Sequence, residues 1–219
     1  MVNDAVTTER SLALGYAPVG AREGLSALLA LDATLGGIVR STTQPLVGQM
    51  RLTWWHEALT ALDTAPPPAE PVLRAVQERV VAAGVTGGEL ATMIDAWEVL
   101  LDDGPPDAAA IDLFGQRRGG VLFAAAATLC GGGDDRVADL GAGWALADLA
   151  GKLSDGAVAS LAGQAAARHL ATGLVGVLPR RLRGLGALAL LARADLAGSA
   201  SPGSPSRVGR LLVHRLTGR

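Results

Sequence analysis

Four acidic and basic side chains could together handle a phosphorylated substrate. Asp148, Lys152 and Asp155 are spaced i, i+4 and i+7, which predicts that they share one face of a helix. Asp32 stands apart from them among Ala and Leu residues. Magnesium takes oxygen ligands, including carboxylates, so carboxylates on one helix face could hold this ion beside a phosphate. The alternative for the 148–155 group is an ordinary exposed face of ion pairs.

Arginines and tryptophans supply candidate substrate-binding residues. Arg51, Trp54 and Trp55 lie within one helical turn, and Arg117 and Arg118 are adjacent. Guanidinium groups match the oxygen atoms of phosphates, and indole rings line apolar pockets. The alternative pairs Arg51 with an acidic residue, packs Trp54 inside a helical bundle and leaves Arg117 and Arg118 as a solvated pair.

The remaining reactive side chains give weaker signals. Asp32 is alternatively solvated, or paired with Arg40 or Arg51. The histidines at 56, 169 and 214 have no evident carboxylate or serine partner in the sequence, so they do not indicate catalysis. Cys130 is the only cysteine, which excludes an internal disulfide and a multi-cysteine metal site. We expect it to be a buried free thiol. The histidines and this cysteine do not predict a metal site.

The elements that must position these residues are helices. Apolar residues recur at helical spacing, Ala and Leu dominate, and no stretch alternates with period two. Proline- and glycine-rich breaks divide the chain, which predicts an all-α single domain over residues 1–219 built as an eight- or nine-helix bundle. The expected helices cover 9–39 (split at Pro18), 45–62, 71–83, 86–101, 107–129, a segment around 140–149, 156–174, 179–196 and 206–217, with a flexible loop at 198–206.

Charge limits the partners. The formal net charge is −2, so nothing attracts nucleic acid at long range, and we expect none as a partner. No uninterrupted apolar run is long enough to span a bilayer, and the N-terminus does not resemble a secretory signal, so we expect a cytoplasmic location. The C-terminal arginines alternate with apolar residues, as in helices that lie on a membrane surface or dock on a partner. Ordinary amphipathic packing is the alternative.

Three stretches resemble the squalene/phytoene synthase family. They are Tyr16-Ala-Pro-x-x-x-Arg22 with the following Ala/Leu helix, the stretch from Val47 to Leu59 that contains the tryptophan pair, and the segment from Phe114 to Phe123 that leads into an alanine-rich helix. The resemblance is clearest over residues 10–155. It implies the helical fold of isoprenoid synthases and a cavity lined by Tyr16, Gly119, Gly120 and Phe123.

The resemblance also shows what this chain lacks. Enzymes of the family hold magnesium and a diphosphate leaving group between two aspartate-rich helices. The window that matches the first aspartate motif reads Gly36-Gly37-Ile38-Val39-Arg40, without a carboxylate. The second corresponds to residues 143–155, where only Asp148 and Asp155 remain. With Asp32, one helical turn before the first window, they are the candidate catalytic residues that the resemblance implies.

Three functions are therefore open. The leading hypothesis is a catalytically degenerate family member that acts as a prenyl- or lipid-binding module or as an assembly module, similar to a mitochondrial branch that acts in assembly of respiratory complex I. The first alternative is an active magnesium-dependent transferase that joins two prenyl diphosphates head to head; magnesium is expected as a cofactor only in this case. The second is a helical interaction module without a cavity. Expected partners are a prenyl diphosphate or lipid, another protein, or the periphery of a membrane.

Overall fold

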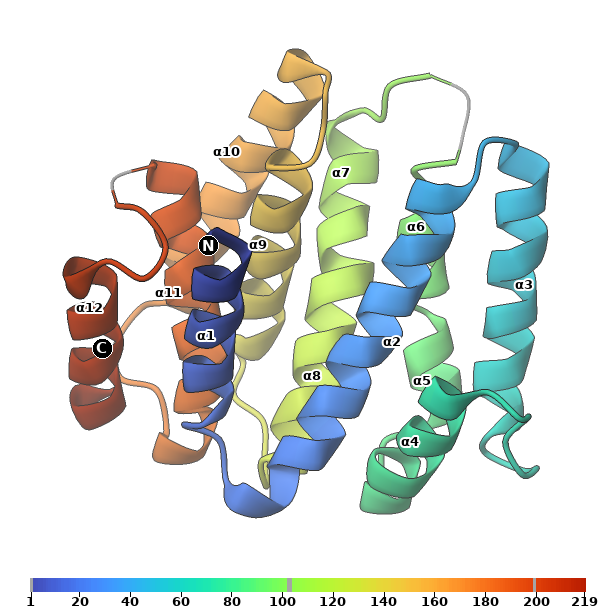
Figure 1. Cartoon of the computed structure of the whole chain (residues 1–219), viewed down its shortest axis with the longest axis horizontal. Coiled ribbons are helices and arrows are strands. Elements are labelled where there is room, and N and C mark those ends of the chain that lie inside the picture. The colour runs from blue at the N-terminus through green and yellow to red at the C-terminus, as the bar shows by residue number, and fades with distance from the viewer. Residues whose placement is uncertain (1, 102–103, 199) are drawn as a thin grey trace.

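The computed structural model describes residues 2–101, 104–198 and 200–219, and these residues form helices without any strand (Figure 1). The all-α fold predicted from the sequence is confirmed. The helices are α1 (Val2–Leu14), α2 (Arg22–Ser41), α3 (Pro45–Ala61), α4 (Pro71–Arg79), α5 (Gly87–Ala91), α6 (Ile94–Glu98), α7 (Ala108–Phe114), α8 (Val121–Leu129), α9 (Val137–Ala150), α10 (Gly156–Gly173), α11 (Arg183–Ala197) and α12 (Pro205–Thr217), with short helical turns η1 (Val19–Ala21), η2 (Val81–Ala83) and η4 (Arg180–Leu182) and the π-helical η3 (Gly115–Gly120).

Helix starts in the first half follow local sequence signals. Pro45 and Pro71 occupy the first turns of α3 and α4, where the missing N–H costs nothing. Thr86 caps α5, accepting a hydrogen bond from the Glu89 backbone N–H while the Glu89 side chain accepts one from the Thr86 N–H. The single helix expected over 86–101 is instead two short ones, α5 and α6, separated by a turn.

The helix expected over 107–129 continues through a π-helical stretch. Asp107 caps α7 through the Ala110 N–H, and η3 joins α7 to α8. A Cβ on Gly119 would lie 1.9 Å from the carbonyl oxygen of Gly141, and a Cβ on Gly141 would lie 2.0 Å from that of Gly119. These two glycines thus let η3 and α9 touch backbone to backbone.

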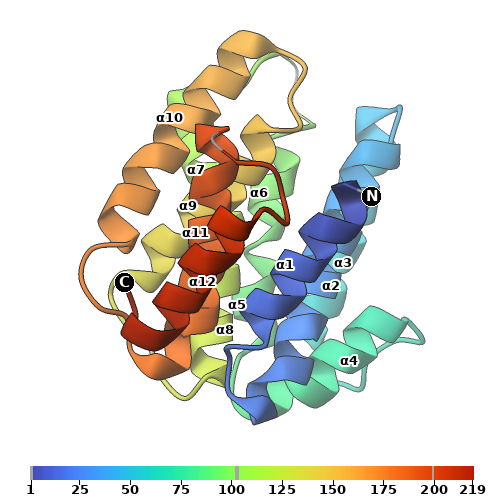
Figure 2. The ribbon, with the colours of Figure 1, turned by 60° about the vertical axis from the view of Figure 1, so that its left-hand side comes forward.

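The two ends of the described chain meet in a buried ion-pair cluster. Arg207 on α12 pairs with Glu9 on α1 at 2.8 Å and with Asp195 on α11 at 2.6 Å. The Gly203 N–H also donates to Glu9. α12 begins at Pro205, so it takes up the last part of the loop expected at 198–206, whose residue 199 lies outside the described part. Figure 2 shows α1, α11 and α12 side by side.

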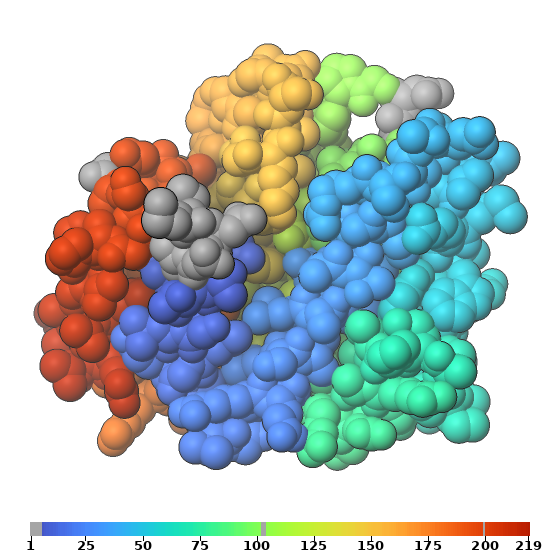
Figure 3. Space-filling model, in the orientation of Figure 1, coloured from blue at the N-terminus to red at the C-terminus, as the bar shows by residue number. Residues whose placement is uncertain are grey.

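α2 packs one face against the rest of the bundle, and Figure 3 shows its other face at the surface. Leu28, Leu31 and Leu35 on this helix are fully buried, and the helix contacts α3, α4, α6 and α8. By length and composition the segment Val19–Ser41 could cross a membrane, which differs from the expectation that no apolar run is long enough, and half of its apolar stretch is buried inside the protein. The buried half of this segment contributes to the core of the bundle.

Candidate functional site

Arg118 joins the two helices that carry the candidate carboxylates. Its Nε and Nη2 donate to the two carboxylate oxygens of Asp32 at 2.7 and 2.8 Å, the paired geometry in which arginine binds carboxylates best. Its Nη1 lies 2.9 Å from Asp148 Oδ2. The side chain therefore bridges α2 and α9 from η3, which lies between them in the chain.

Aromatic rings surround this guanidinium. It lies 4.6 Å from the ring centroid of Trp97, 5.1 Å from that of Trp144 and 5.6 Å from that of Phe114. Such contacts attract a cation through the negative faces of the rings. The sequence reading missed these three rings, since they come from α6, α9 and α7 and no spacing links them.

The expectation of a solvated Arg117–Arg118 pair is correct for Arg117 and wrong for Arg118. Arg118 is only 4% exposed, whereas Arg117 is 44% exposed and lies 3.7 Å from Asp95. Burial alone would lower the pKa of the Arg118 guanidinium, but the Asp32 and Asp148 carboxylates outweigh that effect and raise it. Arg118 is therefore a permanent buried cation. It also takes the place of Arg40 and Arg51 as the partner of Asp32.

The expected face of Asp148, Lys152 and Asp155 does not exist. α9 ends at Ala150, and Asp155 caps the next helix by accepting hydrogen bonds from the Ala157 and Val158 N–H groups. Lys152 does pair with Asp148, at 2.7 Å. Asp148, at 11% exposure, is much less solvated than an exposed ion-pair face requires.

Asp148 lies among cations. Besides Arg118 and Lys152, Arg10 approaches its Oδ1 at 3.8 Å. Burial alone would raise the pKa of Asp148, but the guanidinium of Arg118 and the ammonium of Lys152 hold it below its ordinary value. Asp148 is thus an ionised carboxylate whose charge is already balanced.

The residues around the tryptophan pair lie on α3. Arg51 is exposed, and its Nη1 lies 3.4 Å from the hydroxyl of Ser41 instead of an acidic residue. Trp55 is buried, while Trp54 is 45% exposed, which corrects the expectation that Trp54 packs inside the bundle. The two rings meet edge to face at 5.5 Å. The structure therefore places Arg51 and Trp54 on the surface, apart from the Arg118 centre.

The four residues expected to line a cavity are spread over different places. Tyr16 lines a cavity of about 1070 Å³ between the two ends of the chain. Gly120 borders a smaller one of about 390 Å³ beside His169. Gly119 is taken up by its contact with Gly141, and Phe123 is fully buried against Trp144.

The space beside Asp148 is small. The hollow lined by Arg10, Trp144, Asp148 and neighbouring α11 residues holds about 50 Å³. Ligand pockets are commonly about 300–1,000 Å³. This hollow is therefore too small for a substrate with a long hydrocarbon chain.

His169 has partners that the sequence did not reveal. Its Nδ1 lies 2.6 Å from Asp139 and its Nε2 lies 3.0 Å from Asp112, which links α10 to α9 and α7. Across the part of the chain that the structure describes, no three His, Cys, Asp or Glu side chains gather where they could hold a metal ion. This histidine therefore ties helices together with two carboxylates.

Comparison with known proteins identifies the scaffold. The model of the squalene/phytoene synthase family matches residues 4–174, which is more than the 10–155 over which the resemblance is clearest by eye. Neither the curated proteins nor the solved structures gave a match. The match includes α2, η3 and α9, so the Arg118 bridge lies within the matched region.

Proposed function

Because the chain belongs to the squalene/phytoene synthase family, we propose that it is a member without prenyl transfer activity that uses the family scaffold as a binding or assembly module. The observation that carries this proposal is the Arg118 guanidinium, which engages both oxygens of Asp32 and one oxygen of Asp148. Asp148 lies in the region that corresponds to the second aspartate motif, and Asp32 lies one helical turn before the window that matches the first.

The residues present do not fit magnesium. Three of the four oxygens of Asp32 and Asp148 already contact cationic nitrogens within 3 Å, and the fourth lies 3.8 Å from Arg10. A divalent ion placed between them would meet the positive charge of Arg118 and would need the carboxylates to give up their partners. Asp155, the third candidate, is committed to capping α10.

The size of the space near Asp148 supports the same conclusion. Prenyl transfer would require both a diphosphate and its hydrocarbon chain beside the metal, and the hollow there holds about 50 Å³. The aromatic rings of Trp97, Trp144 and Phe114 fill the surroundings of the guanidinium. The centre thus has the composition of a buried structural bridge.

The direct test is release of pyrophosphate from farnesyl or geranylgeranyl diphosphate in the presence of magnesium. We expect no release above the level without protein, under conditions in which an active family enzyme turns over. Asp148→Asn and Asp155→Asn are assayed beside the wild type; asparagine also caps helices, so the second variant keeps α10 intact. Circular dichroism confirms that each protein is folded.

Turnover by the wild type that is lost in Asp148→Asn would overturn the proposal and assign a transferase, and the Asp155→Asn variant shows whether Asp155 takes part. A second readout is independent of turnover. Magnesium that binds specifically to the folded protein raises its melting temperature. We therefore expect the protein to have the same melting temperature in magnesium chloride as in sodium chloride of equal ionic strength.

A further inference from the structure

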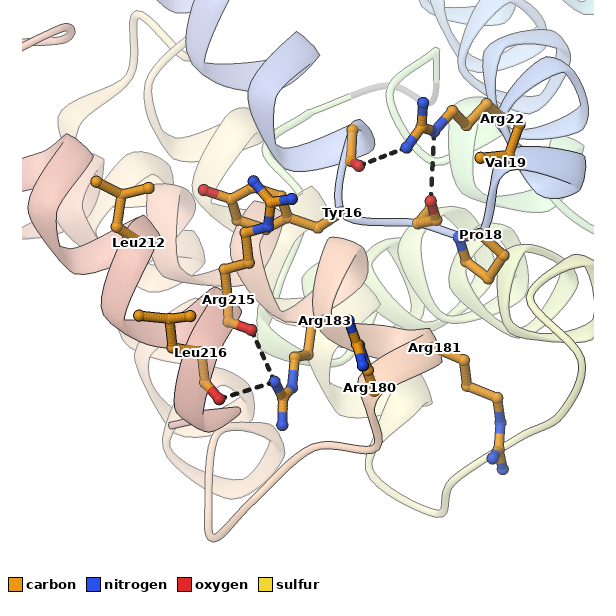
Figure 4. Close-up of a pocket in the computed structure, with 12 residues that line it drawn as sticks. Tyr16, Pro18, Val19, Arg22, Arg180, Arg181, Arg183, Leu212, Arg215 and Leu216 are labelled. Atoms are coloured by element: carbon orange, nitrogen blue, oxygen red, sulfur yellow. Dashed lines mark hydrogen bonds between the residues drawn. The ribbon is translucent and has the colours of Figure 1, made fainter.

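The cavity of about 1070 Å³ lies where the two ends of the chain meet. It is bounded by the turn from α1 to α2, by η4 and the start of α11, and by the last turns of α12 (Figure 4). We call it the arginine cavity, because it is lined by the arginines at 22, 180, 181, 183 and 215. Figure 3 shows the N-terminal and C-terminal parts of the chain adjoining on one face.

None of these five guanidiniums forms an ion pair with a carboxylate of the described residues, and no acidic side chain lines the cavity. Arg181 points away from Tyr16 and Arg215 in Figure 4, and its charge contributes to the lowered pKa of Asp134. Like charges gathered in a concave site repel one another unless an anion joins them. This distribution reflects the sequence: residues 174–219 contain eight arginines and one acidic residue, Asp195, which is already paired with Arg207. The cavity therefore has a strong positive charge in a chain whose net charge is negative.

Two of the arginines are held in place by backbone carbonyl groups. Arg22 donates to the carbonyl oxygens of Gly15 at 2.7 Å and Ala17 at 3.3 Å. Arg183 donates through Nη1 to those of Arg215 at 2.7 Å and Leu216 at 3.1 Å. These bonds orient the guanidiniums without neutralising them, so less entropy is lost when an anion binds.

Other polar atoms of the lining lack partners. The Tyr16 hydroxyl and the Arg183 Nε are buried, and neither has a hydrogen-bond partner among the described residues. Buried polar groups are almost always satisfied by protein, water or ligand. The guanidinium of Arg215 lies 5.2 Å from the Tyr16 ring centroid, on the same wall of the cavity. The lining therefore contains donors that the described residues leave unsatisfied.

The rim of the cavity is apolar and exposed. Val19 is 77% exposed, Leu212 46% and Leu216 79%. Exposed apolar side chains around a cationic site suit a ligand whose charged group is attached to an apolar body, because the body buries them while the arginines take the charge.

We propose that the arginine cavity binds a phosphate group, either on the headgroup of an anionic lipid or free in solution. A guanidinium group can donate two parallel hydrogen bonds to two oxygens of one phosphate, and five such groups line this cavity. The site is separate from the Arg118 centre. It deepens the proposed binding role and rests on it, but it is tested by binding alone, whereas pyrophosphate release tests the loss of prenyl transfer.

The experiment has two arms. In the first, the protein is sedimented with vesicles of phosphatidylcholine, with and without phosphatidic acid. In the second, calorimetry measures binding of inorganic phosphate. The test variant is Arg180→Gln with Arg181→Gln, and the control is Arg74→Gln with Arg210→Gln, which removes the same charge from exposed positions outside the cavity.

Binding should fall roughly tenfold or more in the test variant and remain near wild type in the control, since charged hydrogen bonds to phosphate are lost only in the former. Arg215→Gln should give a similar loss, which guards against a folding defect caused by the first pair. Binding only to phosphatidic acid vesicles supports the lipid headgroup as the source, and binding of inorganic phosphate without vesicle binding supports the free anion.

Leu216→Ser separates these sources further. It should weaken vesicle binding and leave binding of inorganic phosphate unchanged, while Leu161→Ser, an exposed leucine on α10, should affect neither. The proposal is overturned if the wild type binds neither phosphate nor phosphatidic acid vesicles, or if the Arg74/Arg210 control loses as much binding as the test variant.

Discussion

Arg118 and Asp32 lie 86 residues apart in the chain, yet their side chains form two hydrogen bonds of 2.7 and 2.8 Å inside the helical bundle. Both residues are almost fully buried. A buried ion pair adds little stability over an apolar pair of the same size, but removing Asp32 leaves the buried charge of Arg118 with only Asp148 to compensate it. Replacing one residue of the bridge should therefore lower the stability of the protein more than the intact bridge raises it.

The first prediction concerns this pair. Asp32→Asn should lower the free energy of unfolding by about 3–5 kcal/mol, because Arg118 keeps its charge in the core. Urea unfolding followed by tryptophan fluorescence measures the change. The control is Glu23→Gln, which removes an exposed 2.8 Å pair with Arg79 and should cost about 0–1 kcal/mol. Equal losses in the two variants would contradict a structural role for the buried bridge.

The second prediction concerns pH. The pKa of Asp148 is held below its unfolded value, so its ionised form stabilises the fold fully above about pH 4–5, and this contribution is lost as the pH falls through the folded-state pKa. Asp148→Asn should therefore destabilise the protein at neutral pH and do so progressively less below about pH 4. Unfolding free energies at several pH values check this. A constant difference across that range would show that Asp148 is not held ionised by Arg118 and Lys152.

The third prediction concerns the contact between η3 and α9. Gly119→Ala should destabilise the protein by about 1–3 kcal/mol or more, since its methyl group would meet the backbone of Gly141, which cannot rotate away. Gly120→Ala is the matched control: its nearest contact would be 3.7 Å away, and alanine favours helix over glycine. Thermal melts of both variants suffice. Equal melting temperatures would rule out the close backbone contact.

The fourth prediction concerns the single cysteine. Burial raises the pKa of the Cys130 thiol to about 11, and the thiolate is the reactive form. At about pH 8, where a free cysteine is partly ionised, the native protein should react with a thiol reagent far more slowly than the same protein unfolded in guanidinium chloride. A native rate close to that of free cysteine would mean that the thiol is exposed.

Local signals in the sequence predicted most helix boundaries. Pro45, Pro71 and the Thr86 cap act within a few residues of where they stand, so their effects could be read without the fold. Asp155 carried a similar signal: it precedes Gly156 at the start of an apolar stretch, as helix caps do. The prediction that Asp155 shares a helix face with Asp148 rests on their i, i+7 spacing and does not take this capping signal into account.

The Arg118 centre could not be predicted in the same way. Two adjacent arginines look identical in a sequence whether they are solvated or buried, and here one of each kind occurs. The difference arises because η3 directs Arg118 towards residues on α2 and α9, which are brought together only by the fold. The arginine cavity depends likewise on the meeting of two chain ends, although the excess of arginine after residue 174 was visible beforehand.

The guanidinium between Asp32 and Asp148 also constrains how this sequence can change over evolution. Replacing Arg118 first would leave the buried carboxylate of Asp32 without its cationic partner, while Asp148 would keep Lys152. Adding carboxylates first would place them beside a centre whose charges are already balanced. Each single substitution towards a metal-binding centre therefore carries a cost in stability before any benefit appears. Natural selection acting one substitution at a time would tend to preserve the bridge, so relatives that contain it should retain all three residues together.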